Sequence, residues 1–465
     1  MDILLAPFQY LNDAGSTIMM PIILTIFGCV LGAGFGKSLR AGLTVGVGFI
    51  GLNLVIGQVF GGQLVPAVTE MCTKYGLSLN TIDVGWPAAA AIAFASQVGV
   101  FIIPLGLAVN IVMILTGTTQ TVDVDIWDYW HFAFTGALVQ AITGSLLWGF
   151  AAAIFNMMII MVLGDYTAPL VQESLNMPGI SLPHGFSTAY APIAMLFNWI
   201  IEKIPGLRDI DINTDTLQKK FGIFGEPLLL GTMLGLIIGF LAYFNPADVR
   251  ASSISILNLA IQLGAGLVLI PRMAALLMEG LLPISDAANK FVSDHFKGAG
   301  KIYIGLDSAV GVGHPVTLAI ALVLVPVAVF LAVILPGNTV LPMADLSVIP
   351  WMFVLITPIV HNNGFRGILI GVIVLIVGLY ISTDLAPTIT AVATEVGFDM
   401  NGAASISSIC DGANPLTWGI FRLFGLNPII GLVVVGVIAV ALAIWNKKRI
   451  AKENAELAAA TADEQ

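Results

Sequence analysis

PIIGLVVVGVIAVALAIWNKKR, residues 428–449, is the stretch of this sequence that decides its fold class. No charged side chain occurs between Pro428 and Trp445, and a basic cluster, Lys447-Lys448-Arg449, follows directly. An uncharged apolar run of this length predicts a helix that crosses a membrane. Basic residues beside the end of such a helix favour the cytoplasmic side. We therefore expect a membrane-spanning helix here, followed by a cytoplasmic tail over residues 447–465.

The same apolar character extends over the whole chain. Its 465 residues are 58% hydrophobic and only 10% charged, whereas soluble proteins carry about 25% charged residues. We expect an all-α polytopic membrane protein with about eleven transmembrane helices, including single spans at 88–115 and 132–163. Shorter broken stretches near 183–201, 302–313 and 402–420 are typical of re-entrant hairpins or interfacial helices. A net charge of −10 gives no indication of nucleic-acid binding.

Motifs recur in the same order in the two halves of the chain. SLRAGLTVGVGFIGLNLVIG (38–57) resembles GFRGILIGVIVLIVGLYIST (364–383), AVTE (67–70) matches VATE (392–395), and DVGWP (83–87) matches DGANP (411–415). This order favours an inverted repeat, with halves at 1–220 and 221–446, as in many carriers. Chance similarity between apolar helices is the alternative.

Ionisable and aromatic side chains at breaks in apolar helices are the candidate site residues, because such groups usually line a wet cavity. Trp86 precedes Pro87 in DVGWP and offers an aromatic face to the apolar side of a polyol. His184, between Pro183 and Gly185, can hydrogen-bond hydroxyl groups. His131 and Thr135 are spaced to share one helix face. Asp307 lies in GLDSAVGVGHP (305–315), at the tip of a predicted hairpin.

A second group of polar residues also occurs at breaks, and helix capping is the alternative to binding for Asp83 and Glu226. Its members are Asp83, Glu226, Asn338, His361 and Asn414. The sequence has no zinc-ligand spacing, nucleophile elbow, dinucleotide fingerprint or Walker motif. The three cysteines are scattered, so neither a disulfide framework nor a metal site is predicted. We expect no metal and no cofactor.

Taken together, several motifs resemble one family. DVGWP, DIWDYWHFAFTGAL (125–138), LPHG (182–185), QKKFGIFGEP (218–227) and IGLD (304–307) are similar to the galactitol-specific membrane component, EIIC, of the bacterial sugar phosphotransferase system. The similarity runs from about Ile18 to Trp445 and extends, more distantly, to the ascorbate-specific components. Thr135 and Gly185 depart from the ascorbate pattern, which favours a neutral polyol.

The resemblance implies a homodimer in the bacterial inner membrane, with core and dimerisation domains interleaved across both halves and moving against each other. It implies substrate contacts from Trp86, His131, Thr135, His184 and Asp307, with Asp307 or His184 as the candidate base. A separate cytoplasmic protein, EIIB, would supply a phosphocysteine, which EIIA charges in turn.

Group translocation of galactitol or a similar polyol is therefore the function that the sequence favours. The alternative is an ion-coupled secondary transporter of a small polar solute, which also uses inverted repeats and broken helices. An intramembrane hydrolase needs a catalytic dyad or a metal pair, and the spacing of histidines and acids predicts neither. A scaffold or channel leaves the repeated acid–Gly–Pro breaks unexplained.

Overall fold

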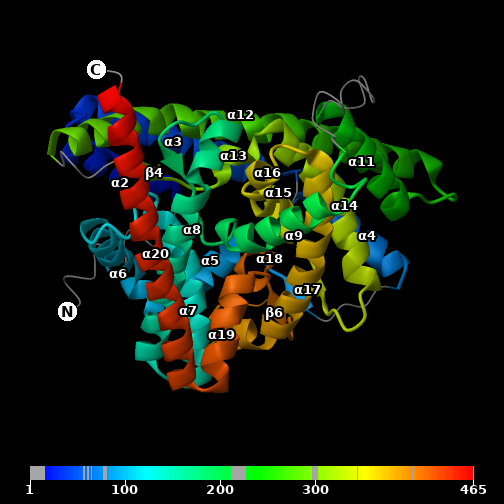
Figure 1. Ribbon diagram of the computed structural model, residues 1–465. Helices are drawn as coiled ribbons and strands as arrows, with labels where there is room; N and C mark the ends of the chain where they lie inside the picture. Colours follow the sequence, from blue (N-terminus) through cyan, green and yellow to red (C-terminus); the bar gives the residue numbers. More distant parts are fainter. Residues whose placement is uncertain are drawn as a thin grey trace.

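The computed structural model describes residues 16–55, 58–59, 62–63, 65–76, 81–210, 227–295, 302–342, 344–398, 400 and 403–463. Helices dominate (Figure 1). Within the described ranges, five are long and apolar enough to cross a membrane: α6 (Gln97–Leu115), α8 (Leu146–Ser174), α14 (Pro315–Ile334), α17 (Gly364–Glu395) and α20 (Pro428–Asp463). This agrees with a helical membrane protein, while about eleven crossings remains a prediction.

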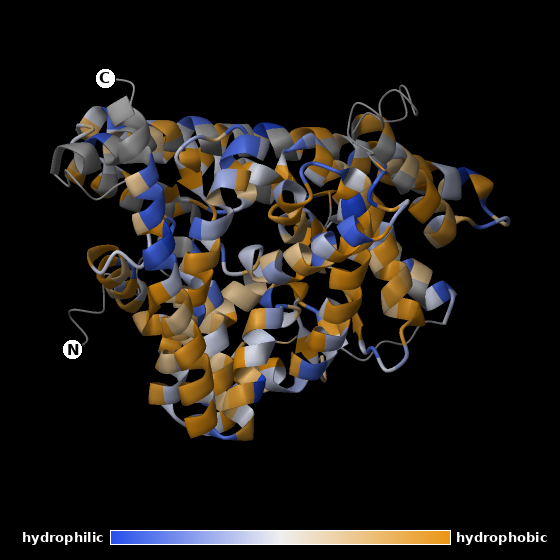
Figure 2. Cartoon of the chain, in the orientation of Figure 1, coloured by the Kyte–Doolittle hydropathy of each residue, from blue (hydrophilic) through white to orange (hydrophobic). Residues whose placement is uncertain are grey.

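Helix α20 illustrates how the apolar surface is divided. Its buried residues Val435 and Ala439 pack on α8 and α19, while Val433 and Val437 are exposed. Figure 2 shows this helix hydrophobic over most of its length and hydrophilic near the basic cluster. An outer face of exposed valine and isoleucine is stable in lipid, which solvates apolar side chains.

A group of helices packs mainly on itself at one side of the molecule. It consists of α2 (Ser16–Val30), α3 (Phe35–Val55), α4 (Val65–Lys74), α11 (Pro227–Tyr243) and α12 (Val249–His295). The 47 residues of α12 run along the top of Figure 1 and pack on α3 and α11. Gly235 lets α11 approach closely, since a Cβ there would lie 2.4 Å from the Cα of Ala260.

Two predicted single spans are broken in the structure. The stretch 88–115 divides into α5 (Trp86–Ala95) and α6 at Ser96, whose backbone is extended and whose Oγ accepts a hydrogen bond from the Gly99 amide at 3.0 Å. The stretch 132–163 divides into α7 (Trp130–Thr143) and α8 at Gly144, which has a φ of 67°. Ser96 caps the start of α6, and the left-handed Gly144 ends α7. Neither residue interrupts the apolar sequence, so hydropathy alone did not predict these breaks.

In the described residues, six short strands form two three-stranded parallel sheets, which the sequence analysis did not predict. One has the order β5 (Val340–Leu341), β1 (Thr81–Asp83), β6 (Ile406–Ser407), and the other the order β2 (Thr121–Asp123), β4 (Tyr303–Gly305), β3 (Ile180–Ser181). In each sheet the central strand comes from one half of the chain and both neighbours come from the other. The sheets therefore interleave the two halves.

Short helices follow the strands and bring polar residues to the sheet edges. They are η2 (Ile126–Tyr129), η3 (Thr188–Tyr190) with α9 (Ala191–Lys203), α13 (Ala309–Val312), η5 (Ala344–Val348) with α15 (Ile349–Phe353) and α16 (Ile356–Ile359), and α18 (Ile409–Gly412) with α19 (Pro415–Leu426). Proline in the first turn starts α5, α9, α14, α15 and α19, where its missing amide costs no hydrogen bond. Because parallel strands end at the same edge, the residues that follow them converge.

Candidate functional site

Three polar side chains meet beyond the carboxyl ends of β2, β3 and β4. Asp128 follows β2, His184 follows β3 and Asp307 follows β4. The His184 Nε2 lies 3.3 Å from Asp307 Oδ1 and 3.8 Å from Asp128 Oδ1. Asp128 and His184 are each 4% exposed. The sheet thus assembles a buried histidine between two carboxyl groups that are distant in sequence.

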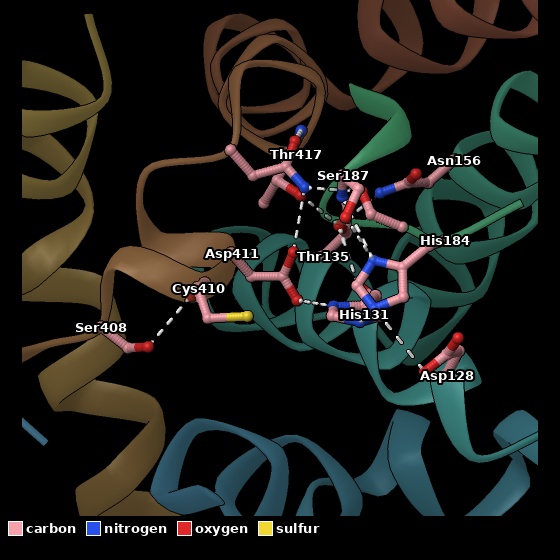
Figure 3. A network of polar contacts seen from close by, with 12 residues as sticks. Asp128, His131, Thr135, Asn156, His184, Ser187, Ser408, Cys410, Asp411 and Thr417 are labelled. Carbon is pink, nitrogen blue, oxygen red and sulfur yellow. Dashed lines mark hydrogen bonds and ion pairs between the residues drawn. The ribbon is translucent and has the colours of Figure 1, made fainter. Parts of the chain in front are cut away.

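His131 joins this cluster from the first turn of α7. Its Nε2 lies 3.3 Å from His184 Nε2, and its Nδ1 lies 2.6 Å from Asp411 Oδ2 (Figure 3). Asp411 is fully buried in α18 and adopts a φ of 55°, a left-handed conformation that costs energy for a residue other than glycine. Asn414 holds the strained residue by donating to Asp411 Oδ1 at 2.9 Å. The network therefore joins the two halves of the chain.

His184 is oriented by the loop that follows it. The Ser187 amide donates to His184 Nδ1 at 3.2 Å, while the Ser187 hydroxyl donates to the Trp351 carbonyl at 2.7 Å. Gly185 leaves room for the neighbouring ring, since a Cβ there would lie 2.4 Å from His131 Cβ. These contacts hold both imidazoles in one arrangement.

Thr135 lies one turn beyond His131 and is fully buried. Its hydroxyl contacts Thr417 Oγ1 at 2.8 Å and accepts from Asn156 Nδ2 at 2.6 Å. Figure 3 shows these side chains beside the histidine pair. Thr135 therefore ties α7 to α8 and α19 next to the cluster.

The cluster is rich in acid, and its electrostatics favour neutral groups. Burial raises the pKa of Asp128, and the negative charges of Asp307, Asp125, Asp123 and Asp411 raise it further. Burial also lowers the pKa of His184, and neighbouring His131 adds to this effect. Both groups lie outside the five candidate spans. Neutral imidazole and carboxylic acid groups are hydrogen-bonding partners suited to an uncharged polyhydroxy ligand.

Two sets of side chains are close enough to hold a metal ion: Asp128 with His131 and His184, and Asp125 with Asp128 and Asp307. Because His131 Nδ1 and His184 Nδ1 both have protein partners, each ring would offer only its Nε2. The sequence-based expectation of no metal remains a prediction.

A second acid cluster lies at the edge of the sheet β5-β1-β6. Asp83 accepts from the Asp345 amide at 2.7 Å, and Asp345 accepts from the Trp86 amide at 2.7 Å. Asp345 also accepts from Ser408 Oγ at 2.5 Å and from the Cys410 amide at 3.2 Å. Burial raises the pKa of Asp83 well above its ordinary value, and Asp345 adds to this effect. Through Cys410, this cluster adjoins Asp411 and hence His131.

The structure separates the predicted site residues into two groups. His131, His184 and Asp307 come together, with Thr135 beside them. Trp86 is half-buried and lies at the second acid cluster, and within the described part of the chain it makes no hydrogen bond or ion pair to the histidines.

The second group of predicted residues is scattered. Asn338 donates to the carbonyls of Ala332 and Val340 and so shapes the turn before β5. His361 is exposed, with a φ of 53°. Asn414 donates to Asp411 and to the Gly185 carbonyl, at the edge of the cluster. Glu226 lies outside the described residues.

Comparisons with known proteins identify the family. Residues 10–403 match the family model for the sugar-specific permease component of the PTS system. The chain belongs to this permease family. It is 39% identical over 446 residues to a putative permease IIC component of Escherichia coli K12, covering 96% of this chain and all of the relative. The permease is also 37% identical over 430 residues to the galactitol-specific EIIC components of Escherichia coli K12 and O157:H7, covering 92% of this chain and 93% of each relative.

Asp128, Asp345 and Asp411 are site residues that the sequence analysis did not select. Asp128 lies in the aromatic stretch DIWDYWHF, which is typical of a membrane interface, and Asp411 was expected to be a structural counterpart of Asp83. One signal was present: TID (81–83) and TVD (121–123) repeat the same pattern ahead of a helix break. Without knowledge of the parallel sheets, this pattern does not place the acids together.

Proposed function

We propose that this PTS permease binds galactitol or a similar polyol and delivers it for phosphorylation by a cytoplasmic EIIB. The observation that carries the proposal is the cluster of His131, His184, Asp307 and Asp128 beyond three adjacent strands, in a chain 37% identical to galactitol-specific components. Buried imidazole and carboxyl groups match the alternating donors and acceptors of a polyol.

In this proposal the substrate hydroxyls replace the contacts that the cluster now makes within itself. His184 bridges to Asp307 and His131, so a polyol must insert between these groups. Thr135 orients α7 at the cluster. Trp86 would cover the apolar side of the polyol's carbon skeleton. This requires α5 to approach the histidines. The half-burial of Trp86 and the packing of α5 on α7 support this step.

The order of strands supports an inverted repeat. Exchanging β1 with β4, β2 with β5 and β3 with β6 converts one sheet into the other. The helices between them correspond as well: α5 and α6 with α13 and α14, and α8 with α17. This correspondence favours halves near 1–220 and 221–446. In this correspondence DVGWP, which follows β1, is equivalent to the segment that follows β4. The sequence match pairs it with DGANP instead.

The packing divides the described elements into two groups. The helices α2, α3, α4, α11 and α12 pack chiefly on one another, while the remaining elements surround the two sheets. We assign the first group to a dimerisation domain and the second to a core domain that carries the substrate across the membrane. The permease would then be a homodimer in the bacterial inner membrane, with its C-terminus in the cytoplasm.

Uptake of labelled galactitol into membrane vesicles tests the function. With EIIB, EIIA, and the phosphoenolpyruvate-dependent enzymes that charge them, the label should accumulate as a phosphate ester and resist a protonophore. Full-rate accumulation of free galactitol without EIIB would exclude group translocation. Collapse of that uptake by a protonophore would instead favour the ion-coupled transporter, for which the cluster of buried acids around Asp128 is the supporting observation.

A further inference from the structure

The hydrogen bonds around His184 define which of its ring nitrogens carries the proton. Its Nδ1 faces the backbone amide of Ser187 at 3.2 Å, and an amide can only donate. The Ser187 hydroxyl also lies 3.3 Å from this nitrogen, but it donates its one hydrogen to the Trp351 carbonyl. His184 Nδ1 is therefore an acceptor, and the neutral ring carries its hydrogen on Nε2.

The hydrogen bonds around His131 define the opposite tautomer. Its Nδ1 lies 2.6 Å from Asp411 Oδ2. In our assignment Asp411 is a carboxylate, whose Oδ1 accepts from Asn414 Nδ2 and whose Oδ2 accepts the hydrogen that His131 carries on Nδ1. A neutral imidazole with a hydrogen on Nδ1 has its lone pair on Nε2. That nitrogen faces the cluster, 3.3 Å from the Nε2 hydrogen donor of His184.

We propose that His131 Nε2 is the base that removes the proton from the substrate hydroxyl, that Asp411 positions it, and that His184 acts as a hydrogen-bond donor to the substrate. This assignment rests on the proposed function and names the roles within its site. It differs from the expectation that Asp307 or His184 is the base, because the His184 Nε2 is already protonated in the neutral ring.

A substrate hydroxyl oxygen forms a bond to the phosphorus of the EIIB phosphocysteine as the phosphorus–sulfur bond breaks. The electron pair of that bond leaves with the sulfur as a thiolate. The hydroxyl proton passes to His131 Nε2, and the imidazolium that results is stabilised by the Asp411 carboxylate. Positioned general-base catalysis of this kind contributes about 10²–10⁴-fold.

The arrangement also accounts for the strain at Asp411. Asp411 is fully buried and has a positive φ. A glycine, such as the neighbouring Gly412, adopts a positive φ at lower cost. A residue held in a strained conformation beside a histidine nitrogen is typical of a functional site. Asp411 is a positioning residue, since it contacts the histidine and not the substrate.

Nitrogen NMR of ¹⁵N-histidine-labelled permease at pH 8 tests the tautomers directly. Among the signals of the five histidines, one from a ring protonated at Nδ1 should disappear in His131→Asn, and one from a ring protonated at Nε2 should disappear in His184→Gln. In Asp411→Asn the His131 signal should change towards the Nε2 tautomer. An Nε2 proton or an imidazolium at His131 in the wild type would overturn the assignment.

Phosphorylation kinetics with phosphorylated EIIB and galactitol test the roles. His131→Asn retains a donor to Asp411 but removes the base, so kcat should fall about 100-fold or more while galactitol affinity changes less than threefold. His184→Gln retains a donor at the Nε2 position, so KM should rise while kcat falls less than tenfold. His361→Asn is the matched control, because His361 is exposed and Asn tolerates its positive φ.

The outcomes separate this assignment from the proposed function. If wild type forms galactitol phosphate but His131→Asn retains its kcat, the function stands and the assignment fails. If His184→Gln loses kcat more than His131→Asn does, His184 is the base and the assignment fails. If the wild type binds galactitol but forms no phosphate ester, the proposed function fails and the base assignment fails with it.

Discussion

Contacts from the protein fix the rings of His131 and His184 on several sides. Asp411 holds one ring through Nδ1, Ser187 holds the other, and Gly185 lies against the first. Gly185 and Ser187 belong to the loop after β3, whereas Asp411 comes from the other half of the chain. A substitution that adds volume at this point must therefore move a ring that the proposal assigns to the substrate.

Gly185→Ala should lower galactitol affinity at least tenfold in calorimetric titration. The added Cβ would lie 2.4 Å from His131 Cβ, and overpacking of a filled site costs about 1–3 kcal/mol. Gly419→Ala is the matched control, because a Cβ at Gly419 meets nothing within 4 Å. Equal affinity in both variants would show that the polyol does not bind against the His131–His184 pair.

Individual residues of the site could be predicted where a polar group interrupts an apolar run. His131, His184 and Asp307 satisfied that criterion and meet in the structure. The partner of His131 could not be predicted, because Asp411 is 280 positions away and resembles a helix-capping residue. Only the fold shows that a carboxylate orients this imidazole.

At the scale of elements, the site depends on short helices that begin at capped breaks. Asn414 caps α19 by accepting from the amides of Leu416 and Thr417, and it also donates to Asp411 and the Gly185 carbonyl. Asn427 caps α20 in the same way, accepting from the amides of Ile429 and Ile430, and lies at an exposed position. The two asparagines differ mainly in their distance from the histidine cluster.

Asn414→Ala should lower both the unfolding free energy and galactitol affinity. Loss of a cap costs about 0.5–2 kcal/mol, and the Gly185 carbonyl and Asp411 would also lose a donor. Thermal unfolding in detergent and calorimetric titration measure the two effects. Asn427→Ala should lower stability by the cap contribution alone and leave affinity unchanged; a parallel loss of affinity in both variants would contradict this account.

The strands could not be predicted from the sequence, for a physical reason. Each has only two or three residues, which is too short for an alternating pattern to be detected. Their pairing depends on neighbours more than a hundred residues away, such as Thr339, whose carbonyl accepts from the Thr81 amide. Hydropathy correctly predicted long apolar segments, but it did not predict the breaks at Ser96 and Gly144.

At the scale of the whole molecule, the two sheets make each half depend on the other. In residues 1–220 alone, β1 would lack both neighbours, and β2 and β3 would lack the central strand β4. Unpaired backbone amides and carbonyls are costly in an apolar environment. The halves therefore fold as one unit, although the sequence motifs repeat between them.

Separate expression of residues 1–220 and 221–465 tests this dependence. Co-expressed fragments should copurify and bind galactitol, whereas either fragment alone should show no cooperative thermal transition. The full-length permease in the same detergent is the control. A single fragment that unfolds cooperatively would show that the sheets are not required to complete each half.

Galactitol binding to purified His184→Ala is the most direct test of the site. His184 contacts three of the groups that we assign to the substrate, and removal of a buried hydrogen-bond partner to a ligand costs about 1–3 kcal/mol. Calorimetric titration should show wild-type binding and an affinity at least fivefold weaker in His184→Ala, with His361→Asn unchanged. Equal affinity in wild type and His184→Ala would contradict the placement of the polyol at this cluster.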